Sequence, residues 1–407
     1  MDLFERWESN VRGYARTYPT VFKSASNARQ TDEAGKSYID FFGGAGVLNF
    51  GHNNPKMKEA IIEFIQSDGI PHSLDMMTTT KRDFIKSFTE TIMEPRGWDY
   101  RMQFTGPTGT NAVEASLKLA RRVTGRRRVI AFTNGFHGMT LGALACTANA
   151  YFRNAAGVPL NYVERLPFGH PLDGMEEAYS DPSSGYEPPA AILVEPIQAE
   201  GGVNVADEQW LKDIRKFARD RGALFILDDI QAGCGRTGSY FSFDGMDLDP
   251  DIITLAKGIG GFGTPLAMNL NKPEFDKHGS PGEHTGTFRG QGISFVAGKV
   301  AMDYFQDDSF MAEVRRKGEI MEKRLKKMAG PGMEVRGKGM MQGLDTKDGA
   351  FAKKVVAECF NQGLLLGGCG TEGRVAKLIP PLTIDDADLD EGLNIMETAM
   401  QTVMVPA

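Results

Sequence analysis

Apolar runs alternate with helical repeats through most of the sequence, and this alternation is the first indication of the fold. Strand-like runs, most of them rich in apolar residues, occur at 101–104, 129–132, 190–194, 224–227 and 251–254. Segments with apolar residues at helical spacing lie between them, at 111–123, 139–148, 208–221 and 294–305. This order predicts an α/β fold, in which a mostly parallel sheet carries helices on both faces.

Both ends of the sequence depart from this alternation. Residues 3–16 place large apolar side chains at helical spacing, which predicts one amphipathic helix. Alternation within 20–42 predicts short strands, and helical spacing returns at 56–66. After residue 300, helical patterns at 310–328 and 348–361 accompany short apolar stretches, which indicates a small α+β unit.

The composition is that of a large globular protein without a membrane span. With 407 residues, of which 41% are hydrophobic, the chain has enough material for a large core and two domains. A net charge of −7 argues against non-specific binding to nucleic acid, and no apolar run is long enough to cross a bilayer. The N-terminal residues lack the apolar core of a secretion signal, so we expect a cytoplasmic protein.

The cysteines indicate neither a metal site nor a disulfide framework, because no two of them have Cys-x-x-Cys spacing. They are Cys146, Cys234, Cys359 and Cys369. We therefore expect a reducing environment and no bound metal. The basic run at 126–128 is interpreted as a solvated helix end or turn rather than a nucleic-acid patch.

One lysine stands at the end of a predicted buried strand. The apolar run 252–256 leads into Lys257, which is followed by glycines at 258, 260, 261 and 263. A lysine buried at such a position loses its proton readily and becomes a nucleophilic amine. The glycines would allow a flat, bulky group to approach the backbone. A surface lysine beside a glycine-rich turn is the alternative that this stretch alone leaves open.

An acid after a neighbouring strand favours the chemical interpretation of Lys257. The apolar run 223–227 ends at Asp228, 29 residues before the lysine, which is about one βαβ unit. Acids at the ends of parallel strands are well placed to meet a ligand. A lysine that forms a Schiff base and an acid that keeps a pyridinium protonated are the minimum equipment for binding pyridoxal 5′-phosphate (PLP).

The two motifs around these residues resemble those of the class III (ω-amino acid) aminotransferases of PLP fold type I. The motifs read LDDIQAGCGRTG at 227–238 and TLAKGIGG at 254–261, and the resemblance extends from about residue 20 to 400. Family members usually have Glu where this chain has Asp229. The resemblance implies an aspartate-aminotransferase-like fold, with a large αβα domain and a smaller α+β domain built from both termini. We accordingly expect residues 1–50 to join the small domain, 51–300 to form the large PLP-binding domain, and 301–407 to complete the small one.

Further residues match cofactor-binding positions of this family. The loop at 104–110 leads into a predicted helix, whose free amides would bind a phosphate. The resemblance assigns the phosphate to Gly109 and Thr110, and places Phe136 against the ring. It implies that His137 is a positional hydrogen bonder and that Gln231 bonds the phenolic oxygen of the cofactor.

A second loop implies an oligomer. The segment HTGTFRG at 284–290 matches the family segment whose threonine, here Thr287, reaches the phosphate site of the neighbouring subunit. The resemblance therefore implies a homodimer, or a dimer of dimers, with composite active sites.

Three residues are candidates for binding substrate. Glu200 occupies the family position of a switch, which neutralises the positive residue that binds the α-carboxylate of 2-oxoglutarate and then moves aside. The usual partner is Arg, but this chain has Lys377 at that position and an arginine at Arg374. Lysine cannot form a bidentate pair with a carboxylate, so either residue remains a candidate for the carboxylate.

Other stretches resemble the diaminobutyrate aminotransferases of the ectoine-pathway type within this family, among them GAGVLNFGHNNP, GPTGTNAVEA and TNGFHGMTLGAL. The implied reaction transfers an amino group between L-glutamate and L-aspartate 4-semialdehyde, giving L-2,4-diaminobutyrate and 2-oxoglutarate. A diaminobutyrate enzyme of a siderophore or antibiotic pathway is equally compatible. Other ω-aminotransferases, acting on acetylornithine, ornithine or 4-aminobutyrate, and a class III racemase remain alternatives. A non-catalytic PLP-fold protein is disfavoured by the intact pair of Lys257 and Asp228.

Overall fold

The computed structural model describes residues 2–172 and 174–404. Its largest element is a seven-stranded sheet with strand order β4-β12-β11-β10-β7-β5-β6. All neighbouring strands are parallel except at β12, which runs antiparallel to both of its neighbours. The strands are β4 (Arg101–Gly106), β5 (Val129–Phe132), β6 (Val163–Leu166), β7 (Ala191–Val194), β10 (Leu224–Asp228), β11 (Ile252–Leu255) and β12 (Ala267–Asn271).

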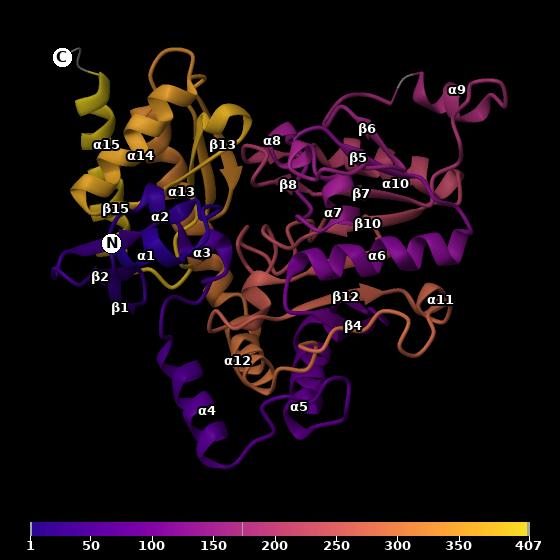
Figure 1. Cartoon of the computed structure of the whole chain (residues 1–407), viewed down its shortest axis with the longest axis horizontal. Coiled ribbons are helices and arrows are strands. Elements are labelled where there is room, and N and C mark those ends of the chain that lie inside the picture. The colour runs from indigo at the N-terminus through magenta and orange to yellow at the C-terminus, as the bar shows by residue number, and fades with distance from the viewer. Residues whose placement is uncertain (1, 173, 405–407) are drawn as a thin grey trace.

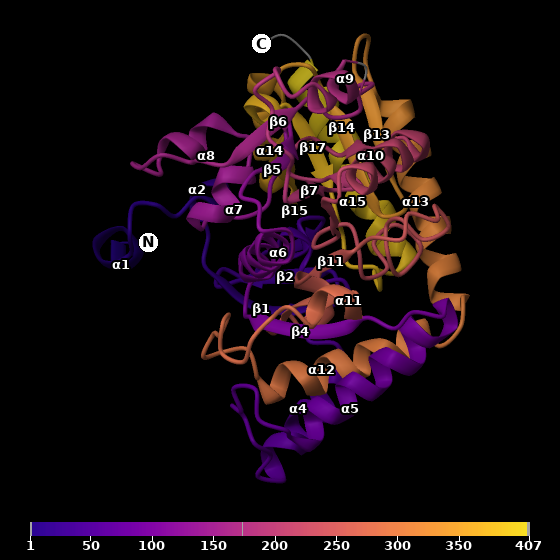
Figure 2. The ribbon, with the colours of Figure 1, turned by 90° about the vertical axis from the view of Figure 1, so that its right-hand side faces the viewer.

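Helices cover both faces of this sheet, as the alternating pattern predicts. Figure 1 shows α6 along one face and α10 on the opposite side, while Figure 2 shows α4, α5 and α12 packed together below β4. The helices of this part are α4 (Pro55–Gln66), α5 (Thr79–Phe88), α6 (Gly109–Thr124), α7 (Leu141–Cys146), α8 (Ala150–Asn154), α9 (Met175–Ser180), α10 (Glu208–Asp220), α11 (Pro273–Asp276) and α12 (Gly292–Met302). Short elements complete it: η1 (Thr89–Met93), η2 (Glu94–Arg96), η3 (Lys257–Gly260), η4 (Asp303–Phe305), β8 (Ile197–Gln198) and β9 (Asn204–Val205).

The two ends of the chain share a second core. β3 pairs in parallel with β15, so that Ile39 lies beside Leu364. Buried side chains from the N-terminal strands, such as Phe41, pack with those of the C-terminal helices, such as Met321 and Leu393. Figure 1 shows the indigo and yellow ends of the chain side by side. The N-terminal elements are α1 (Asp2–Trp7), α2 (Tyr14–Thr17), β1 (Phe22–Ser26), β2 (Arg29–Asp32), β3 (Ser37–Asp40) and the turn α3 (Gly43–Gly46).

Elements after residue 308 supply most of this shared core. A four-stranded sheet has the order β13-β14-β17-β16, and its strands are antiparallel. The C-terminal elements are α13 (Ser309–Met328), β13 (Glu334–Lys338), β14 (Met341–Asp345), α14 (Gly349–Gln362), β15 (Leu364–Leu365), β16 (Gly367–Cys369), η5 (Thr371–Gly373), β17 (Val375–Leu378) and α15 (Asp386–Met404).

The prediction of one helix over residues 3–16 is wrong. The segment forms two short helices, α1 and α2, separated by irregular residues. The side chains expected to share a buried face are exposed instead: Leu3 is 68%, Trp7 72% and Val11 89% accessible. Apolar spacing alone does not hold a helix together, because most helical stability comes from packing of the apolar face. Within residues 2–172 and 174–404, none of the helices has the length and apolar character needed to cross a bilayer.

Candidate active site

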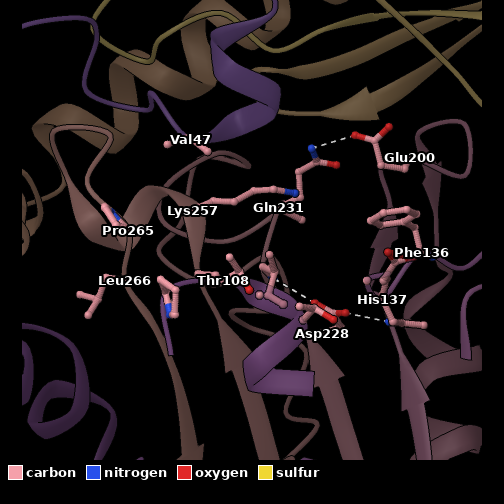
Figure 3. A pocket seen from close by; sticks show the side chains of 18 of the residues that line it. Val47, Thr108, Phe136, His137, Glu200, Asp228, Gln231, Lys257, Pro265 and Leu266 are labelled. Atoms are coloured by element: carbon pink, nitrogen blue, oxygen red, sulfur yellow. Dashed lines mark hydrogen bonds and ion pairs between the residues drawn. The ribbon is translucent and has the colours of Figure 1, made fainter. Parts of the chain in front are cut away.

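A two-part cavity lies where the central sheet meets the shared core of the two chain ends. The inner chamber, of about 330 Å³, is lined by residues that follow the sheet strands, among them Phe136, Asp228 and Lys257. The outer chamber, of about 910 Å³, extends from Lys257 to Tyr14 and to the residues around η5. Phe136, Glu200 and Lys257 line both chambers, so the two parts are continuous. Figure 3 shows Lys257 extended into the inner chamber, with Glu200 and Asp228 on different sides of it.

Lys257 is the first residue of η3 and comes directly after Ala256, which follows β11. Its backbone is left-handed, with φ 53°, a conformation that costs energy in a residue other than glycine. Burial lowers the pKa of the Lys257 amine, although Glu200 opposes this effect. The amine forms no ion pair among the described residues. An amine that lines a cavity and has a lowered pKa loses its proton more readily, which suits it to nucleophilic attack and to proton transfer.

Asp228 ends β10 and is fixed by hydrogen bonds on both carboxylate oxygens. Its Oδ2 lies 2.7 Å from Nδ1 of His137, and its Oδ1 accepts a bond of 3.2 Å from the backbone N–H of Ile230. His137 is itself held, because its backbone N–H donates to Thr147 Oγ1 over 2.9 Å. An acid held in this way presents its charge to the inner chamber with a defined direction.

A second carboxyl group lies beside Asp228. One possible metal-ligand atom from each of His137, Glu195 and Asp228 lies within 4.8 Å of the other two, which is close enough for a metal site. We interpret the group as a hydrogen-bonded acid cluster, because His137 and Asp228 already bond each other. Burial, together with the charge of Asp228, raises the pKa of Glu195 well above its usual value. Glu195 is therefore suited to remain neutral beside the charged Asp228.

The start of α6 lines one side of the inner chamber. Gly109 and Thr110 begin the helix and line the chamber, so their backbone amides are available to an anion. The opposite loop approaches closely: a Cβ added to Gly138 would lie 2.4 Å from Thr110 Oγ1. Thr110 Oγ1 lies 2.6 Å from Thr140 Oγ1, which fixes the hydroxyl at the rim.

These residues fit pyridoxal phosphate. Helix-end amides suit its phosphate, the aromatic face of Phe136 suits its ring, and the carboxylate of Asp228 suits a protonated ring nitrogen. Lys257 supplies the amine that such a cofactor requires. All four groups line the same inner chamber.

Glu200 and Lys377 form an ion pair at the junction of the two chambers. Lys377 belongs to β17, and its Nζ contacts Glu200 Oε1. The side chain of Lys377 is 3% exposed, whereas that of Glu200 is 28% exposed. Although burial raises the pKa of Glu200, Lys377 and Lys257 outweigh it and lower the value to about 2. Burial lowers the pKa of Lys377, but Glu200 outweighs it and raises the value.

Gln231 joins this ion pair to the N-terminal part of the chain. Its Nε2 donates to Glu200 Oε1 over 3.0 Å and to the carbonyl of Ala45 over 2.6 Å. The first of these bonds is drawn in Figure 3. Glu200 is therefore held by two donors, and both must release it before its carboxylate can move away from Lys377.

Two predicted site residues lie away from the chambers. Arg374 directs its Nε to the buried carboxylate of Asp345, with 3.1 Å between Nε and Oδ1. Thr287 lies in the loop before α12, where its carbonyl oxygen accepts a bond of 2.7 Å from Nε2 of His72. Lys377 lines neither chamber, but it contacts Glu200, which lines both, so the geometry favours Lys377 over Arg374 as the partner of Glu200. Thr287 has no contact with the chambers of its own chain.

Two residues that the sequence did not indicate line the outer chamber. Tyr14 lies in α2, and burial, with the charge of Glu200 nearby, raises its pKa. By its spacing, Tyr14 is one apolar position of the helix predicted over 3–16, and no local motif marks it. Arg165 lies in β6 and also lines the chamber. Its position inside the strand-like segment Val-Glu-Arg-Leu is a local signal, because a charged side chain within such a segment needs a polar surrounding.

Comparison with known proteins places the chain in a family. Residues 12–400 match the family described as Aminotransferase class-III. A diaminobutyrate–2-oxoglutarate transaminase of Nocardia farcinica is 50% identical over 412 residues, covering 99% of this chain and 94% of the relative. One of Halomonas elongata, with the same description, is 48% identical and covers 98% of each chain.

Solved structures agree with this placement. An ornithine aminotransferase of Toxoplasma gondii superposes with a TM-score of 0.87 at 26% identity, over 99% of this chain and 94% of that one. Another structure of that enzyme has PLP at partial occupancy in its active site. An acetylornithine aminotransferase of Elizabethkingia anophelis gives a TM-score of 0.80 at 26% identity, over 98% of both chains. The predicted fold type and cofactor are confirmed, and the chain belongs to the PLP-dependent class III aminotransferase family.

Proposed function

We propose that the chain transfers an amino group between L-glutamate and L-aspartate 4-semialdehyde, giving L-2,4-diaminobutyrate and 2-oxoglutarate. The observation that carries this proposal is the full-length similarity, at 44–50% identity, to relatives described as diaminobutyrate–2-oxoglutarate transaminases. The ion pair between Lys377 and Glu200 supports it further. Such a pair can shield the lysine when the substrate lacks a carboxylate on its reacting carbon, and expose it when one is present.

We assign the chemical roles as follows. Bound pyridoxal phosphate would supply an electron-withdrawing ring next to the substrate amine. Asp228, positioned by His137, keeps the ring nitrogen protonated, and Phe136 fixes the plane of the ring. The amine of Lys257 holds the cofactor at rest and moves the proton at the substrate Cα during the reaction. Gly109 and Thr110 hold the phosphate.

Lys377 and Glu200 distinguish the two half-reactions in this proposal. Glutamate and 2-oxoglutarate carry a carboxylate on the reacting carbon, and this group replaces Glu200 at Lys377. The semialdehyde and diaminobutyrate have only hydrogen there, so Glu200 stays on Lys377 and neutralises it. Gln231 supports the second state, because it donates to Glu200 Oε1, the same oxygen that contacts Lys377.

A substrate panel tests the proposed reaction. Purified enzyme supplied with PLP and diaminobutyrate should convert 2-oxoglutarate to glutamate, measured by mass spectrometry. Acetylornithine, ornithine and 4-aminobutyrate should give kcat/KM values at least about tenfold lower. A higher value with one of these donors would reassign the substrate within the family. Interconversion of amino acid enantiomers without formation of a keto acid would indicate a racemase.

We also propose that residues 1–50 and 301–407 form one small domain, that 51–300 form the large one, and that the enzyme works as a cytoplasmic homodimer. The core shared by both chain ends supports the division. Four free, buried cysteines support a reducing compartment. Phe288, beside Thr287, is 54% exposed, as expected for a loop that meets another subunit.

Mixing two inactive variants tests the composite site. Lys257→Ala and Thr287→Ala subunits are combined under conditions in which subunit exchange is verified with a mass label. If Thr287 serves the neighbouring site, one site of each mixed dimer carries both lesions and the other carries neither, so activity reappears. Verified exchange without recovery of activity would mean that Thr287 serves its own chain.

A further inference from the structure

The turn α3 has a left-handed backbone at each of its four positions. The φ values of residues 43–46 are 53°, 60°, 58° and 87°. Three of these residues are glycines, but Ala45 is not, and a left-handed backbone costs energy in a residue with a side chain. Ala45 lines the outer chamber, and Val47, directly after the turn, lines the inner one. Contacts with the rest of the protein must therefore hold this strained backbone at the edge of the cavity.

Asp40, the last residue of β3, supplies such a contact. Its Oδ1 accepts hydrogen bonds from the backbone N–H groups of Phe42, over 2.9 Å, and of Gly43, over 2.8 Å. Its Oδ2 accepts a bond of 3.0 Å from Gln30 Nε2 and lies 2.8 Å from His52 Nε2. The Asp40 side chain is fully buried, and hydrogen bonds to a carboxylate are among the strong ones. Asp40 therefore fixes the backbone at the point where it enters the turn.

The anchored turn contacts Gln231. The carbonyl oxygen of Ala45 accepts a bond of 2.6 Å from Gln231 Nε2, and the same nitrogen donates to Glu200 Oε1 over 3.0 Å. An amide nitrogen carries two hydrogens, so these two bonds use both of them. A Cβ added to Gly46 would lie 3.3 Å from Gln231 Cγ, so the turn and this side chain are closely packed. The position of the Ala45 carbonyl thus determines the direction in which Gln231 donates its other hydrogen.

Gln231 and Lys377 hold the same oxygen atom of Glu200. The backbone of Glu200 is fixed separately, because its carbonyl accepts a bond of 2.9 Å from the N–H of Gly370. Movement of Glu200 away from Lys377 is therefore a movement of the side chain, and the bond from Gln231 opposes it. A series of contacts consequently leads from Asp40, through the turn, to the pair that separates the two half-reactions.

We propose that Asp40 is a positioning residue for substrate selection, which acts by keeping Gln231 directed at Glu200. The inference rests on the proposed function, in which Glu200 stays on Lys377 for diaminobutyrate and leaves it for glutamate. Without Asp40, the strained turn can relax, and Gln231 loses the fixed partner that orients it. Glu200 then leaves Lys377 more readily, so the enzyme should shift its preference toward substrates with a carboxylate on the reacting carbon.

Replacing Asp40 with alanine tests the proposal, because it removes the acceptor of both backbone N–H groups. Each half-reaction is measured alone: glutamate or diaminobutyrate is mixed with PLP-loaded enzyme, and the change in cofactor absorbance gives a second-order rate constant. The ratio of the glutamate constant to the diaminobutyrate constant should rise about 3- to 10-fold, the effect of one lost hydrogen bond. A change that only weakens the fold would lower both constants together and leave this ratio unchanged.

Asp32→Ala is the matched control. Asp32 also ends a strand of the same sheet, is buried, and accepts a bond of 2.9 Å from the backbone N–H of Lys36 in the turn that follows. It lines neither chamber, so its replacement should leave the ratio unchanged.

A milder variant decides if Asp40→Ala fails to fold. In Asp40→Asn the amide oxygen can still accept both backbone N–H groups, so the ratio should rise by a smaller factor. Because both constants are measured on one preparation, the ratio does not depend on the fraction of active enzyme.

A double variant shows whether Asp40 acts through Gln231. Gln231→Ala alone should raise the ratio, because it removes the donor to Glu200. Adding Asp40→Ala to this variant should change the ratio less than twofold, since residues that act through one another give non-additive effects.

Two outcomes would overturn the proposal. In one, the Asp40 variants slow both half-reactions in equal proportion, which would make Asp40 a support of the fold alone. In the other, Asp40→Ala shifts the ratio as much without Gln231 as with it, which would mean that Asp40 acts by another route. Failure of the proposed function appears separately, as a lack of reaction between the wild type and diaminobutyrate. The ratio is then formed with the terminal amino donor of the substrate panel that the wild type accepts, so the test of Asp40 remains valid.

Discussion

Two buried lysines on which the charge of Glu200 acts show how neighbouring charge decides the chemistry of a buried amine. Lys257 follows β11 and has no ion-pair partner among the described residues, so burial lowers its pKa. Burial acts on Lys377 in the same direction, but Glu200 outweighs it and raises the pKa. The same functional group is therefore suited to proton transfer at one position and to carboxylate binding at the other.

The backbone conformations of the two lysines also suit these different roles. Lys257 starts a turn with a left-handed φ of 53°, outside the sheet. Lys377 lies inside a sheet, with Gly343 on one side and Gly367 on the other. A residue that exchanges partners during a reaction needs a side chain that can be redirected, whereas one that defines a binding position benefits from a fixed strand.

Replacing Lys257 with alanine should have the largest effect, because it removes the nucleophile itself. We expect the rate of amino transfer from glutamate to fall by at least roughly 1,000-fold. The visible absorbance of a lysine-bound cofactor should disappear, while the melting temperature stays near that of the wild type. A variant that retains a tenth of the activity would disprove the assigned role.

Replacing Lys377 with methionine should have the next largest effect. The KM for glutamate and 2-oxoglutarate should rise about 10- to 100-fold, because the carboxylate on the reacting carbon loses its cation. The KM for the semialdehyde should change little. Arg374→Met provides the control, because Arg374 pairs with Asp345 outside the chambers. The opposite pattern, with the defect in the Arg374 variant, would transfer the role to that residue.

Replacing Glu200 with glutamine tests how far this carboxylate controls the pKa values of the two lysines. Glu200 raises the pKa of both amines, so its neutral analogue should lower both values. In cofactor-free enzyme, the pH at which Lys257 becomes reactive toward an amine-selective reagent should therefore move down. An upward or unchanged midpoint would show that Glu200 does not act on Lys257.

The last prediction concerns stability rather than activity, at an acid pair with a similar contrast. Asp228 faces the cavity, whereas Asp229 is buried against Ser242, and burial raises the pKa of Asp229 to about 8. The folded state then keeps a proton that the unfolded state releases above about pH 4, so this group makes stability decrease from about pH 4 to 8.

Asp229→Asn should remove this decrease, because an amide does not titrate and can still bond Ser242. Equilibrium unfolding in urea measures the difference, which should grow with pH by up to about 1.4 kcal/mol per pH unit. If the free energy of unfolding changes with pH in the same way in the wild type and in Asp229→Asn, Asp229 is ionised in the folded state.

The strands of the central sheet, and the residues that follow them into the inner chamber, could be predicted from local sequence patterns. The strands β5, β7, β10 and β11 are continuous apolar runs, because parallel strands are buried on both faces. Lys257 and Asp228 stand directly after two such runs, so the positions of both follow from the topology. Local patterns were sufficient where the site is built at strand ends.

Features that depend on distant contacts were not predictable in this way. Tyr14, the first residue of α2, lines the outer chamber, and its neighbours in the sequence carry no sign of this. The separation of Lys377 from Arg374 depends on Asp345, a buried acid on another strand that pairs with the arginine. The antiparallel β12 was not predicted, because its sequence, Ala-Met-Asn-Leu-Asn, has asparagines at 269 and 271 and so lacks a continuous apolar run.

The pairing of β3 with β15 has a consequence for synthesis of the protein. Ile39 meets Leu364 only after the ribosome has translated more than three hundred intervening residues. Until then β3 has one unpaired edge, and the apolar side chains of Ala28, Ile39 and Phe41 lack their C-terminal partners. Such an edge is a site for aggregation in a nascent chain. The first strands to leave the ribosome are thus among the last to complete their core, so nascent chains of this protein should depend on chaperones that shield an exposed N-terminal segment.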